Sequence, residues 1–282
     1  MKQDTSTWFI TGCSTGLGRH LAQTALARGF NVVVTARDPE RVQDIVAASP
    51  GSALALPLDV TEPAQISYAV RLAEERFGGI DVLINNAGYG YRSAIEEGAP
   101  EDVQKLFATN VFGLVAMTRA VLPGMRSRRK GCIVNISSIA GRMALPGSGY
   151  YSATKFAVAG ISDALRKEVA PLGIRVMLVE PGAFRTDFSG RSLQQSPLRI
   201  ADYDETAGRR RKENDSSDGH QAGDPARGAH AIIDTVTAGI MPFRLLLGSD
   251  AISIIQAGLD EQQRELDAWK AISLGTDFPP AH

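Results

Sequence analysis

The sequence is short of cysteine, of net charge and of long apolar runs, and each shortage argues against a class of protein. Its two cysteines and four histidines do not have the spacing of a disulfide framework or a metal site, so we expect no bound metal. A formal net charge of −1 lacks the basic footprint of a nucleic-acid-binding protein. No apolar stretch reaches ~18 residues, and the polar start of the chain is unlike a signal peptide. We therefore expect no membrane span and a cytoplasmic location.

The chain does contain a regular alternation of apolar runs and helical patterns. The apolar runs cover residues 8–10, 32–34, 54–56, 82–84, 133–136 and 174–179. Helical patterns follow the first five runs, at residues 17–29, from Asp38-Pro39 onward, and at 62–77, 100–122 and 149–172. Strands that are apolar throughout and separated by helices are typical of a parallel sheet covered on both faces. The pattern predicts an α/β protein with a three-layer, doubly wound, Rossmann-like sheet.

The alternation stops after Pro181. Residues 189–223 are polar and charged, and we predict that they form a substrate-loop insert. We interpret their basic run, residues 209–212, as a solvated surface, with contact to an anionic substrate as the alternative. A helix over residues 225–236 and a strand over 245–247 complete a sheet of about seven strands, and a last helix is expected over 261–271. Without a repeat or a linker, residues 1–282 are predicted to form a single domain, with a cofactor-binding and catalytic core (residues 5–188) and a C-terminal extension (residues 249–282).

A glycine-rich loop joins the first predicted strand to the first helix. Gly12, Gly16 and Gly18 permit a tight turn and the close approach of a pyrophosphate. The helix N-terminus behind them offers backbone N–H groups and a positive dipole end. A glycine turn that serves only strand–helix packing is the alternative. The residues expected around the cofactor phosphates are Thr11, Gly12, Ser14, Thr15, Gly16, Leu17 and Gly18.

The end of the second predicted strand indicates the choice of dinucleotide. An acidic side chain at this place binds a ribose 2′-hydroxyl, whereas Arg37 suits a 2′-phosphate because a guanidinium can fork onto phosphate oxygens. We therefore predict NADP(H) as the preferred cofactor. Asp38 keeps NAD(H) as the alternative, although it also fits the cap of the next helix.

Further cofactor contacts are expected where the third and fourth strands end. The carboxylate of Asp59, which precedes Val60, suits the adenine amino group, with a turn or cap as the equal alternative. Asn86, Ala87 and Gly88 follow the fourth strand, and such small and amide side chains suit the wall of a crevice at the carboxyl ends of strands. A plain Asn/Gly turn is the alternative there.

Tyr151 and Lys155 indicate the chemistry, since residues four apart share a helix face. A phenol has a pKa of ~10, and a nearby ammonium lowers it, so the pair can exchange a proton with a carbonyl or alcohol oxygen. Tyr150 is five residues from the lysine and therefore off that face. Ser138 follows the fifth strand and can hydrogen-bond the same oxygen, while Asn110 is a buried helical amide that needs a polar partner. Singly, each residue also fits a packing, turn or surface role.

Taken together and in this order, the motifs resemble those of the short-chain dehydrogenase/reductase family, in its compact single-domain branch. The resemblance covers about residues 5–190. It implies that Tyr151 is the general acid/base, that Lys155 lowers its pKa and binds the nicotinamide ribose, and that Ser138 holds the substrate oxygen. It also implies that Asn110 anchors a water in a proton relay. The further cofactor contacts that it implies are Asn86, Gly88, Asn110, Tyr151, Lys155, Pro181, Gly182, Phe184 and Thr186.

The predicted function is reversible hydride transfer between C4 of the nicotinamide and a carbonyl or secondary alcohol. The alternatives are a catalytically inactive NAD(P)-sensing protein of the same fold, or an epimerase or dehydratase. The resemblance implies a homodimer or homotetramer, assembled through the helices near residues 100–122 and 150–172. Residues that suggest a partly apolar substrate pocket are Met143, Ala144, Leu145, Pro146 and Phe184.

Overall fold

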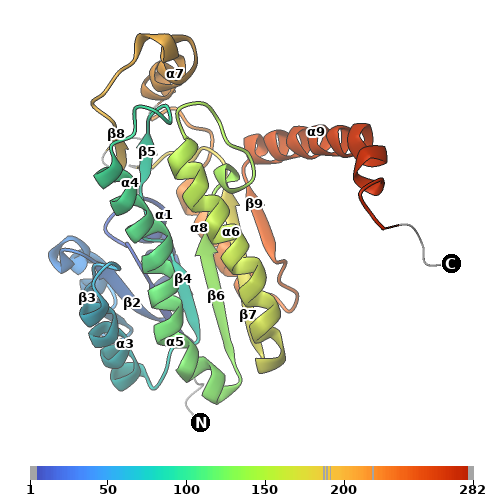
Figure 1. The fold of residues 1–282 in the computed structure, drawn as a ribbon. Helices are drawn as coiled ribbons and strands as arrows, with labels where there is room; N and C mark the ends of the chain where they lie inside the picture. Colours follow the sequence, from blue (N-terminus) through green and yellow to red (C-terminus); the bar gives the residue numbers. More distant parts are fainter. Residues whose placement is uncertain (1–4, 187, 189, 191, 218, 279–282) are drawn as a thin grey trace.

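The computed structural model describes residues 5–186, 188, 190, 192–217 and 219–278. At its centre is a seven-stranded sheet with the order β3-β2-β1-β4-β6-β7-β9, in which every neighbouring pair is parallel (Figure 1). The predicted doubly wound α/β fold is confirmed. The strands are β1 (Thr7–Ile10), β2 (Asn31–Ala36), β3 (Ala53–Pro57), β4 (Val82–Asn85), β6 (Gly131–Ile136), β7 (Ile174–Pro181) and β9 (Arg244–Leu247).

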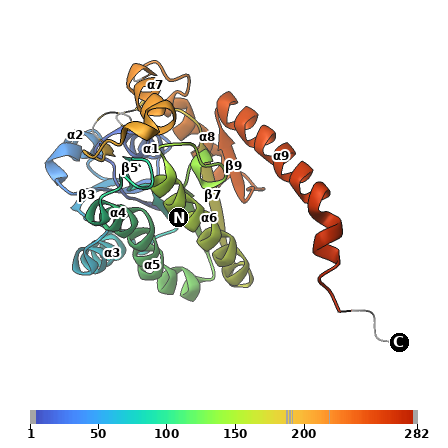
Figure 2. The same cartoon turned by 45° about the horizontal axis from the view of Figure 1, so that its top comes forward.

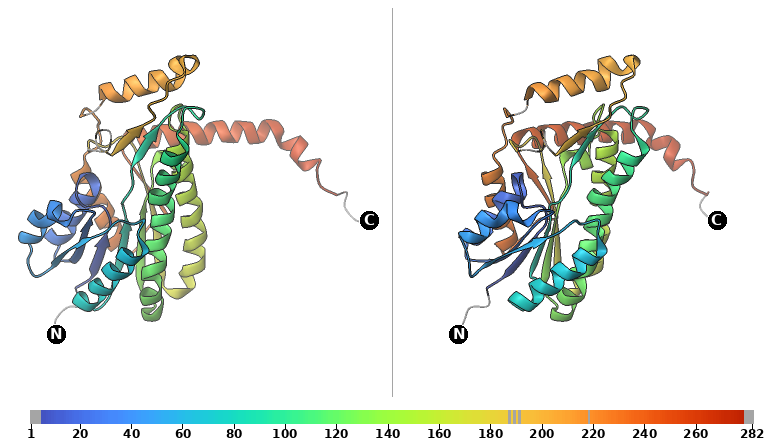
Figure 3. Two further views of the ribbon diagram at one scale, coloured as in Figure 1. Left: turned by 60° about the vertical axis from the view of Figure 1, so that its left-hand side comes forward. Right: turned by 90° about the vertical axis from the view of Figure 1, so that its left-hand side faces the viewer.

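Helices cover both faces of the sheet because the strands carry apolar side chains on both sides (Figure 3). Successive side chains of β1 point to opposite faces, so Trp8 and Ile10 enter one core and Phe9 enters the other. The first core lies under α1 (Gly16–Ala27), α2 (Gln43–Ala47) and α8 (Pro225–Thr237). The second lies under α3 (Pro63–Phe77), α5 (Leu114–Arg128) and α6 (Gly149–Val169).

The helix predicted over residues 100–122 runs on to Arg128 and is not uniform. It consists of α4 (Pro100–Phe107), the π-helix η2 (Ala108–Gly113) and α5. Contrary to the expectation from the sequence, Pro100–Arg128 is long and apolar enough to cross a membrane, with a mean hydropathy of 1.4 in its best window, 44% of which is buried. Core helices of soluble proteins meet the same criterion. Here Met117 and Val121 of α5 are fully buried in the core under the sheet, so the helix is a layer of the fold.

Short helical turns complete the chain between the main elements. The helix expected from Asp38-Pro39 onward divides into η1 and α2. The 3-10 turns are η1 (Pro39–Val42), η3 (Ile139–Gly141), η4 (Ala170–Leu172) and η5 (Ala201–Tyr203), and a second π-helix is η6 (Asp204–Gly208).

The predicted insert contains regular structure that the sequence did not indicate. β8 (Leu193–Gln195) pairs in parallel with β5 (Gly90–Arg92), far apart in the sequence. After η5 and η6 the chain forms α7 (Arg209–Ser217), which lies above the carboxyl end of the sheet, near the β5–β8 pair (Figures 1 and 3). The insert therefore roofs the edge where we expect the functional residues.

The last helix, α9 (Ser249–Leu274), begins at Ser249 rather than at residue 261. Ala251, Ile255 and Gly258 are buried, so its first turns pack on the body of the protein. Every residue from 259 to 278 is exposed, and this half of the helix projects away from the rest of the chain (Figure 2). The sequence signal placed the helix too late because its start is rich in isoleucine and contains Gly258, and both residue types have lower helix propensity than those that follow.

Candidate active site

A cavity of about 750 Å³ opens at the carboxyl edge of the sheet, between the loops that follow β1, β4, β6 and β7. It brings together nearly all the residues that the sequence analysis selected. Thr11 and Asn110 are exceptions, since both are buried behind its wall. Ala144 and Pro146, which the sequence analysis placed in the substrate pocket, are exposed and do not line the cavity. The selected residues that line it are Gly12, Ser14, Thr15, Gly16, Leu17, Gly18, Arg37, Asp59, Val60, Asn86, Ala87, Gly88, Ser138, Met143, Leu145, Tyr151, Lys155, Pro181, Gly182, Phe184 and Thr186.

The glycine-rich loop after β1 is held by the loop after β4. Thr11 Oγ1 accepts hydrogen bonds from the backbone N–H groups of Asn86 and Ala87, both at 2.9 Å. Asn86 Nδ2 donates to the carbonyl oxygens of Thr11 and Gly12 at 2.9 and 3.0 Å. A Cβ at Gly18 would lie 2.3 Å from both Asn86 Nδ2 and the Gly12 carbonyl oxygen, so this crossing requires glycine. The two loops thus form one wall of the cavity.

The same loop presents the N-terminus of α1 to the cavity. Thr15, the N-cap residue, is extended and its side chain makes no capping hydrogen bond, so it does not occupy the first N–H groups of this 12-residue helix. Gly12 and Gly16 have φ angles of +72° and +56°, which residues with a side chain rarely adopt. This donor set fits a pyrophosphate, because free N–H groups and the helix dipole both favour an anion.

Arg37 and Lys105 bring positive charge to the part of the cavity that follows β2 and β3. Asp38 Oδ1 accepts the N–H of Glu40 at 3.1 Å and caps η1. Asp59 Oδ1 accepts from both the N–H and the hydroxyl of Thr61, at 2.9 and 2.7 Å. Asp38 therefore takes the cap role that the sequence left open. Asp59 forms a turn with Oδ1 and also lines the cavity, so its contact with the adenine amino group stays a prediction. Lys105 was not anticipated, since its place on an amphipathic helix does not show that it reaches the cavity.

Tyr151 stands in the first turn of α6, facing the residues after β6. Its hydroxyl faces Ser138, whose side chain lowers the Tyr151 pKa, and its ring centroid lies 5.6 Å from that of Phe188. Lys155, one turn later, donates from Nζ to the Ile136 carbonyl oxygen at 2.9 Å, with Nζ 5.7 Å from the Tyr151 ring centroid. Tyr150 points elsewhere, since its hydroxyl donates to the Ile95 carbonyl oxygen at 2.8 Å. The hydroxyl pair and the lysine thus meet on one side of the cavity.

The expected lowering of the Tyr151 pKa by Lys155 is not found in the protein by itself. Burial raises the pKa of Tyr151 to about 12, and the hydrogen bond with Ser138 opposes this only in part. Burial also lowers the pKa of Lys155 to about 8, because the charged ammonium loses its hydration. A spacing of four residues gives a shared face, but it does not reveal that desolvation dominates both groups.

Asn110 lies in η2, and its side-chain amide is hydrogen-bonded to the backbone of Tyr89, the residue after Gly88. Its Oδ1 accepts the N–H of Tyr89 at 3.0 Å, while Nδ2 donates to the Tyr89 carbonyl oxygen at 2.9 Å and to Thr154 Oγ1 at 3.3 Å. Thr154 Oγ1 in turn donates to the Tyr151 carbonyl oxygen at 2.7 Å. Asn110 therefore ties the wall after β4 to the helix that carries Tyr151. Its role in a water relay stays a prediction.

The loop after β7 is supported by the start of α9. Asp250 Oδ2 accepts the N–H of Ala183 at 2.7 Å. A Cβ at Gly182 would lie 2.3 Å from the Asp250 carboxylate, so the chain approaches α9 closely here. Phe184 packs against Gly228 of α8, at 2.7 Å from its ideal Cβ position. These contacts place the part of the wall that the resemblance assigns to the nicotinamide.

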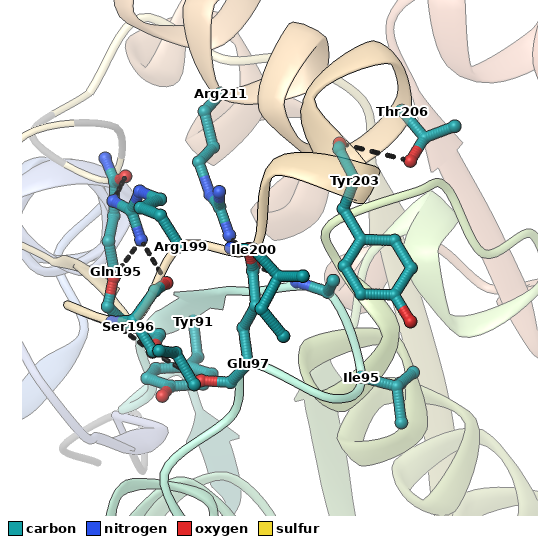
Figure 4. A network of polar contacts seen from close by, with 12 residues as sticks. Tyr91, Ile95, Glu97, Gln195, Ser196, Arg199, Ile200, Tyr203, Thr206 and Arg211 are labelled. Atoms are coloured by element: carbon teal, nitrogen blue, oxygen red, sulfur yellow. Dashed lines mark hydrogen bonds and ion pairs between the residues drawn. The ribbon is translucent and has the colours of Figure 1, made fainter.

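The interpretation of residues 209–212 as a solvated run is wrong for Arg211. This arginine is 6% exposed and forms an ion pair with the carboxylate of Glu97, which is 2% exposed (Figure 4). Glu97 also accepts the N–H groups of Ile200 and Ala94, at 3.0 and 2.8 Å. Burial alone would raise the Glu97 pKa, but these hydrogen bonds and that of Arg211 outweigh it and keep the pKa below its usual value. The pair stays charged at neutral pH and fastens α7 over the cavity.

Most wall residues that the sequence analysis missed belong to β5, β8 and the insert. A three-residue strand has no detectable period, and the only signal was that Tyr89 directly follows the selected Gly88. Within the residues that the structure describes, no group of three or more His, Cys, Asp or Glu side chains is placed to hold a metal ion. The missed residues include Tyr89, Tyr91, Arg92, Lys105, Phe188, Leu193, Gln194, Arg210, Gln221 and Ile254.

Comparison with known proteins gives consistent matches. The model of the short chain dehydrogenase family matches residues 6–197. The oxidoreductase BOA17 of Botryotinia fuckeliana is 36% identical over 274 residues, covering 96% of this chain and 99% of that protein. A short-chain dehydrogenase structure from Streptomyces avermitilis has a TM-score of 0.92 at 42% identity, covering 97% of this chain and 100% of that chain.

Two further solved structures have a nicotinamide cofactor bound, each with 26% identity and a TM-score of 0.73. One is a short chain dehydrogenase from Burkholderia cenocepacia J2315 with NADP, covering 94% of this chain and 98% of that one. The other is the 3-ketoacyl-(acyl-carrier-protein) reductase from Brucella melitensis with NADH, covering 86% and 96%. Both cofactors therefore occur among proteins with this architecture.

Proposed function

Because the chain belongs to the short-chain dehydrogenase/reductase family, we propose that it is an NADP(H)-dependent enzyme that interconverts a carbonyl compound and a secondary alcohol. Membership makes it an oxidoreductase that binds a nicotinamide dinucleotide. The observation that supports the finer proposal is the Tyr151 hydroxyl, paired with Ser138 in a cavity that also contains the glycine-rich loop.

When bound, the nicotinamide supplies or accepts the hydride, and the residues of the chain orient the reactants and move the proton. The glycine-rich loop and the start of α1 would hold the pyrophosphate, and Arg37 would hold the adenosine end. In reduction, the Tyr151 hydroxyl donates its proton to the carbonyl oxygen, which Ser138 Oγ keeps in place. A pKa raised to about 12 keeps this phenol protonated at neutral pH, as a donor requires.

Lys155 assists the reverse reaction, in which Tyr151 must accept the proton of the alcohol. Its pKa of about 8 leaves the ammonium largely charged at pH 7. The hydrogen bond to the Ile136 carbonyl fixes this charge on the side of Tyr151. The positive charge favours the phenolate at the moment when the proton leaves, although it does not dominate the resting pKa.

We expect the purified protein to oxidise NADPH in the presence of ketones or aldehydes, with kcat/KM about 10- to 100-fold above that with NADH. The reason is a charge-assisted contact of Arg37 with the 2′-phosphate, worth roughly 1.5–3 kcal/mol. The absorbance of the reduced nicotinamide measures both rates. Arg37→Ala should lower the NADPH value to that of NADH and leave the NADH value unchanged.

The outcomes of this assay separate the alternatives. A wild-type preference for NADH would contradict the assignment of Arg37 but not the oxidoreductase. Tight cofactor binding without turnover on the whole panel would favour an NAD(P)-sensing protein. Substrate conversion without net cofactor turnover would indicate an epimerase or dehydratase.

We also infer that the protein assembles with a second copy of itself. The outer half of α9 carries an apolar stripe of Leu259, Leu266 and Trp269, whose spacing of seven and three places them on one face, and Trp269 is 59% exposed. Most of the stability of a helix comes from the packing of its apolar face, which this half of α9 lacks among the described residues, so the stripe would be stabilised by a partner. The chain offers apolar counterparts in Phe112 (65% exposed) and Phe156, on the helices that the family resemblance implicates.

Leu266→Glu combined with Trp269→Glu should shift the sedimentation coefficient of the protein to that of a smaller assembly. Two carboxylates on the stripe would have to be buried in the interface, which is unfavourable. Arg264→Glu, on the opposite face of α9, is the matched control and should sediment like wild type. A wild-type monomer at all concentrations would refute the inference.

A further inference from the structure

The substrate end of the cavity carries positive charge that the reaction does not require. Arg92 of β5 and Arg210 of α7 both line it. Among the described residues of the cavity lining, the one acidic side chain is Asp59, whose carboxylate is bonded to Thr61. We propose that Arg92 and Arg210 bind an acidic group of the substrate, a carboxylate or a phosphate. This rests on the proposed reaction at Tyr151.

Packed side chains connect the ring of Tyr151 to β5, the strand that carries Arg92. The rings of Tyr151 and Phe188 are 5.6 Å apart. A Cβ at Gly90 would lie 3.1 Å from the Phe188 ring and 2.7 Å from Leu193, so these two side chains pack over Gly90. Arg92 is two residues further along β5 and therefore faces the same side of the strand. Arg92, Phe188 and Leu193 all line the same cavity as Tyr151.

Arg210 lines the cavity from α7, the helix that lies above the carboxyl end of the sheet. Its neighbour Arg211 is anchored to Glu97, and successive residues of an α-helix point about 100° apart, so the anchored arginine also sets the direction of Arg210. Arg210 Nε is buried and has no hydrogen-bond partner in the described part of the chain. A buried unsatisfied donor costs ~1–3 kcal/mol, which an anionic oxygen would offset. Its ion pair with Glu213, at 3.3 Å, is partly exposed and therefore weak.

The wall between the two ends defines the rest of the substrate. The cavity lining also contains Phe188, Leu193, Met143 and Leu145, which offer no charge. The substrate class that fits is an oxo compound, or its alcohol, in which a hydrocarbon segment separates the reacting carbon from an acidic end. Glu97 is then a positioning residue, because it acts on this site only through Arg211.

The test compares straight-chain methyl-ketone acids of increasing length with their neutral methyl esters, and the matching oxo-alkyl phosphates with their neutral dimethyl esters. We expect kcat/KM for the best acid to exceed that of its ester about 10- to 100-fold, mainly through KM, since charge-assisted hydrogen bonds are worth roughly 1.5–3 kcal/mol. The more efficient series identifies carboxylate or phosphate as the recognised group. Arg210→Gln should remove the preference by lowering kcat/KM for the acid much more than for its ester, and Arg92→Gln should act in the same direction.

Arg209→Gln is the matched control, because Arg209 stands on the same helix, is exposed and pairs with Glu205 outside the cavity. It should keep the preference for acids. Equal efficiency for acid and ester in the wild type, or an equal loss for both in Arg210→Gln, would overturn the proposal. Calorimetric titration with saturated fatty acids tests the anion site separately from the reaction. If the fatty acid binds, Arg210→Gln abolishes that binding and no carbonyl is turned over, the anion site is supported and the proposed function is rejected.

Discussion

Tyr151→Phe should lower kcat for carbonyl reduction by about 10²–10⁴-fold, the range expected for the loss of a general acid, while the Kd for NADPH stays within about twofold. The variant keeps the ring that contacts Phe188 and removes only the hydroxyl that faces Ser138. Stopped-flow or steady-state assays give kcat, and fluorescence titration gives the Kd. Loss of turnover with intact cofactor binding would place Tyr151 in the chemical step.

Tyr150→Phe is the control for that experiment, since its hydroxyl bonds to Ile95 and not to the reacting groups. It should retain kcat. The pH profile supplies a second readout: reduction needs the phenol and should not fall through loss of its proton until the pH approaches the Tyr151 pKa. Oxidation needs the phenolate and should become faster as the pH rises above 7. Near-normal activity of Tyr151→Phe, or a reverse reaction that slows with rising pH, would refute the assignment.

Gly18→Ala should weaken NADPH binding by about 10- to 100-fold. The new Cβ would lie 2.3 Å from Asn86 Nδ2 and from the Gly12 carbonyl oxygen, so at least one of the two hydrogen bonds of Asn86 must break. Each such bond contributes about 0.5–1.5 kcal/mol, and the loop that binds the pyrophosphate would shift with it. Fluorescence titration with NADPH measures the effect.

Gly160→Ala is the matched substitution, because Gly160 also lies within a helix but has nothing within 4 Å of its Cβ position. It should leave NADPH binding unchanged and raise the free energy of unfolding by ~0.5–1 kcal/mol, since alanine has the higher helix propensity. Equal NADPH affinity in the two variants would mean that the crossing of Asn86 and Gly12 does not shape the cofactor site.

The parts of the fold that depend on local pattern were predictable from the sequence. β2 and β6 are buried on both faces and appear as mainly apolar runs, and loops at the carboxyl ends of parallel strands must meet at one edge. For that reason Ser138 and Tyr151 could be placed together. Gly18 could be selected because a strand–glycine–helix junction has few other uses.

The remainder depends on pairing between distant segments, which leaves no local trace. β8 has three residues, mostly polar, and becomes a strand only because β5 lies beside it. Arg211 looks like its solvated neighbours until Glu97, 114 positions earlier in the chain, is placed against it. The pKa values of Tyr151 and Lys155 follow from burial, and burial is a property of the assembled cavity.

The π-helix at Ala108–Gly113 sets the angle about the helix axis between the side chain of Asn110 and the core-facing side chains of α5. A π-turn accommodates one more residue than an α-turn, and each residue of an α-helix adds about 100° of rotation. With the extra residue, Asn110 meets Tyr89 while Met117 and Val121 still enter the core under the sheet. Deleting one residue within this turn would restore a regular α-helix. Either Asn110 would then rotate away from Tyr89, or Met117 and Val121 would rotate out of the core. The number of residues in this turn is therefore constrained, independently of which side chains they carry.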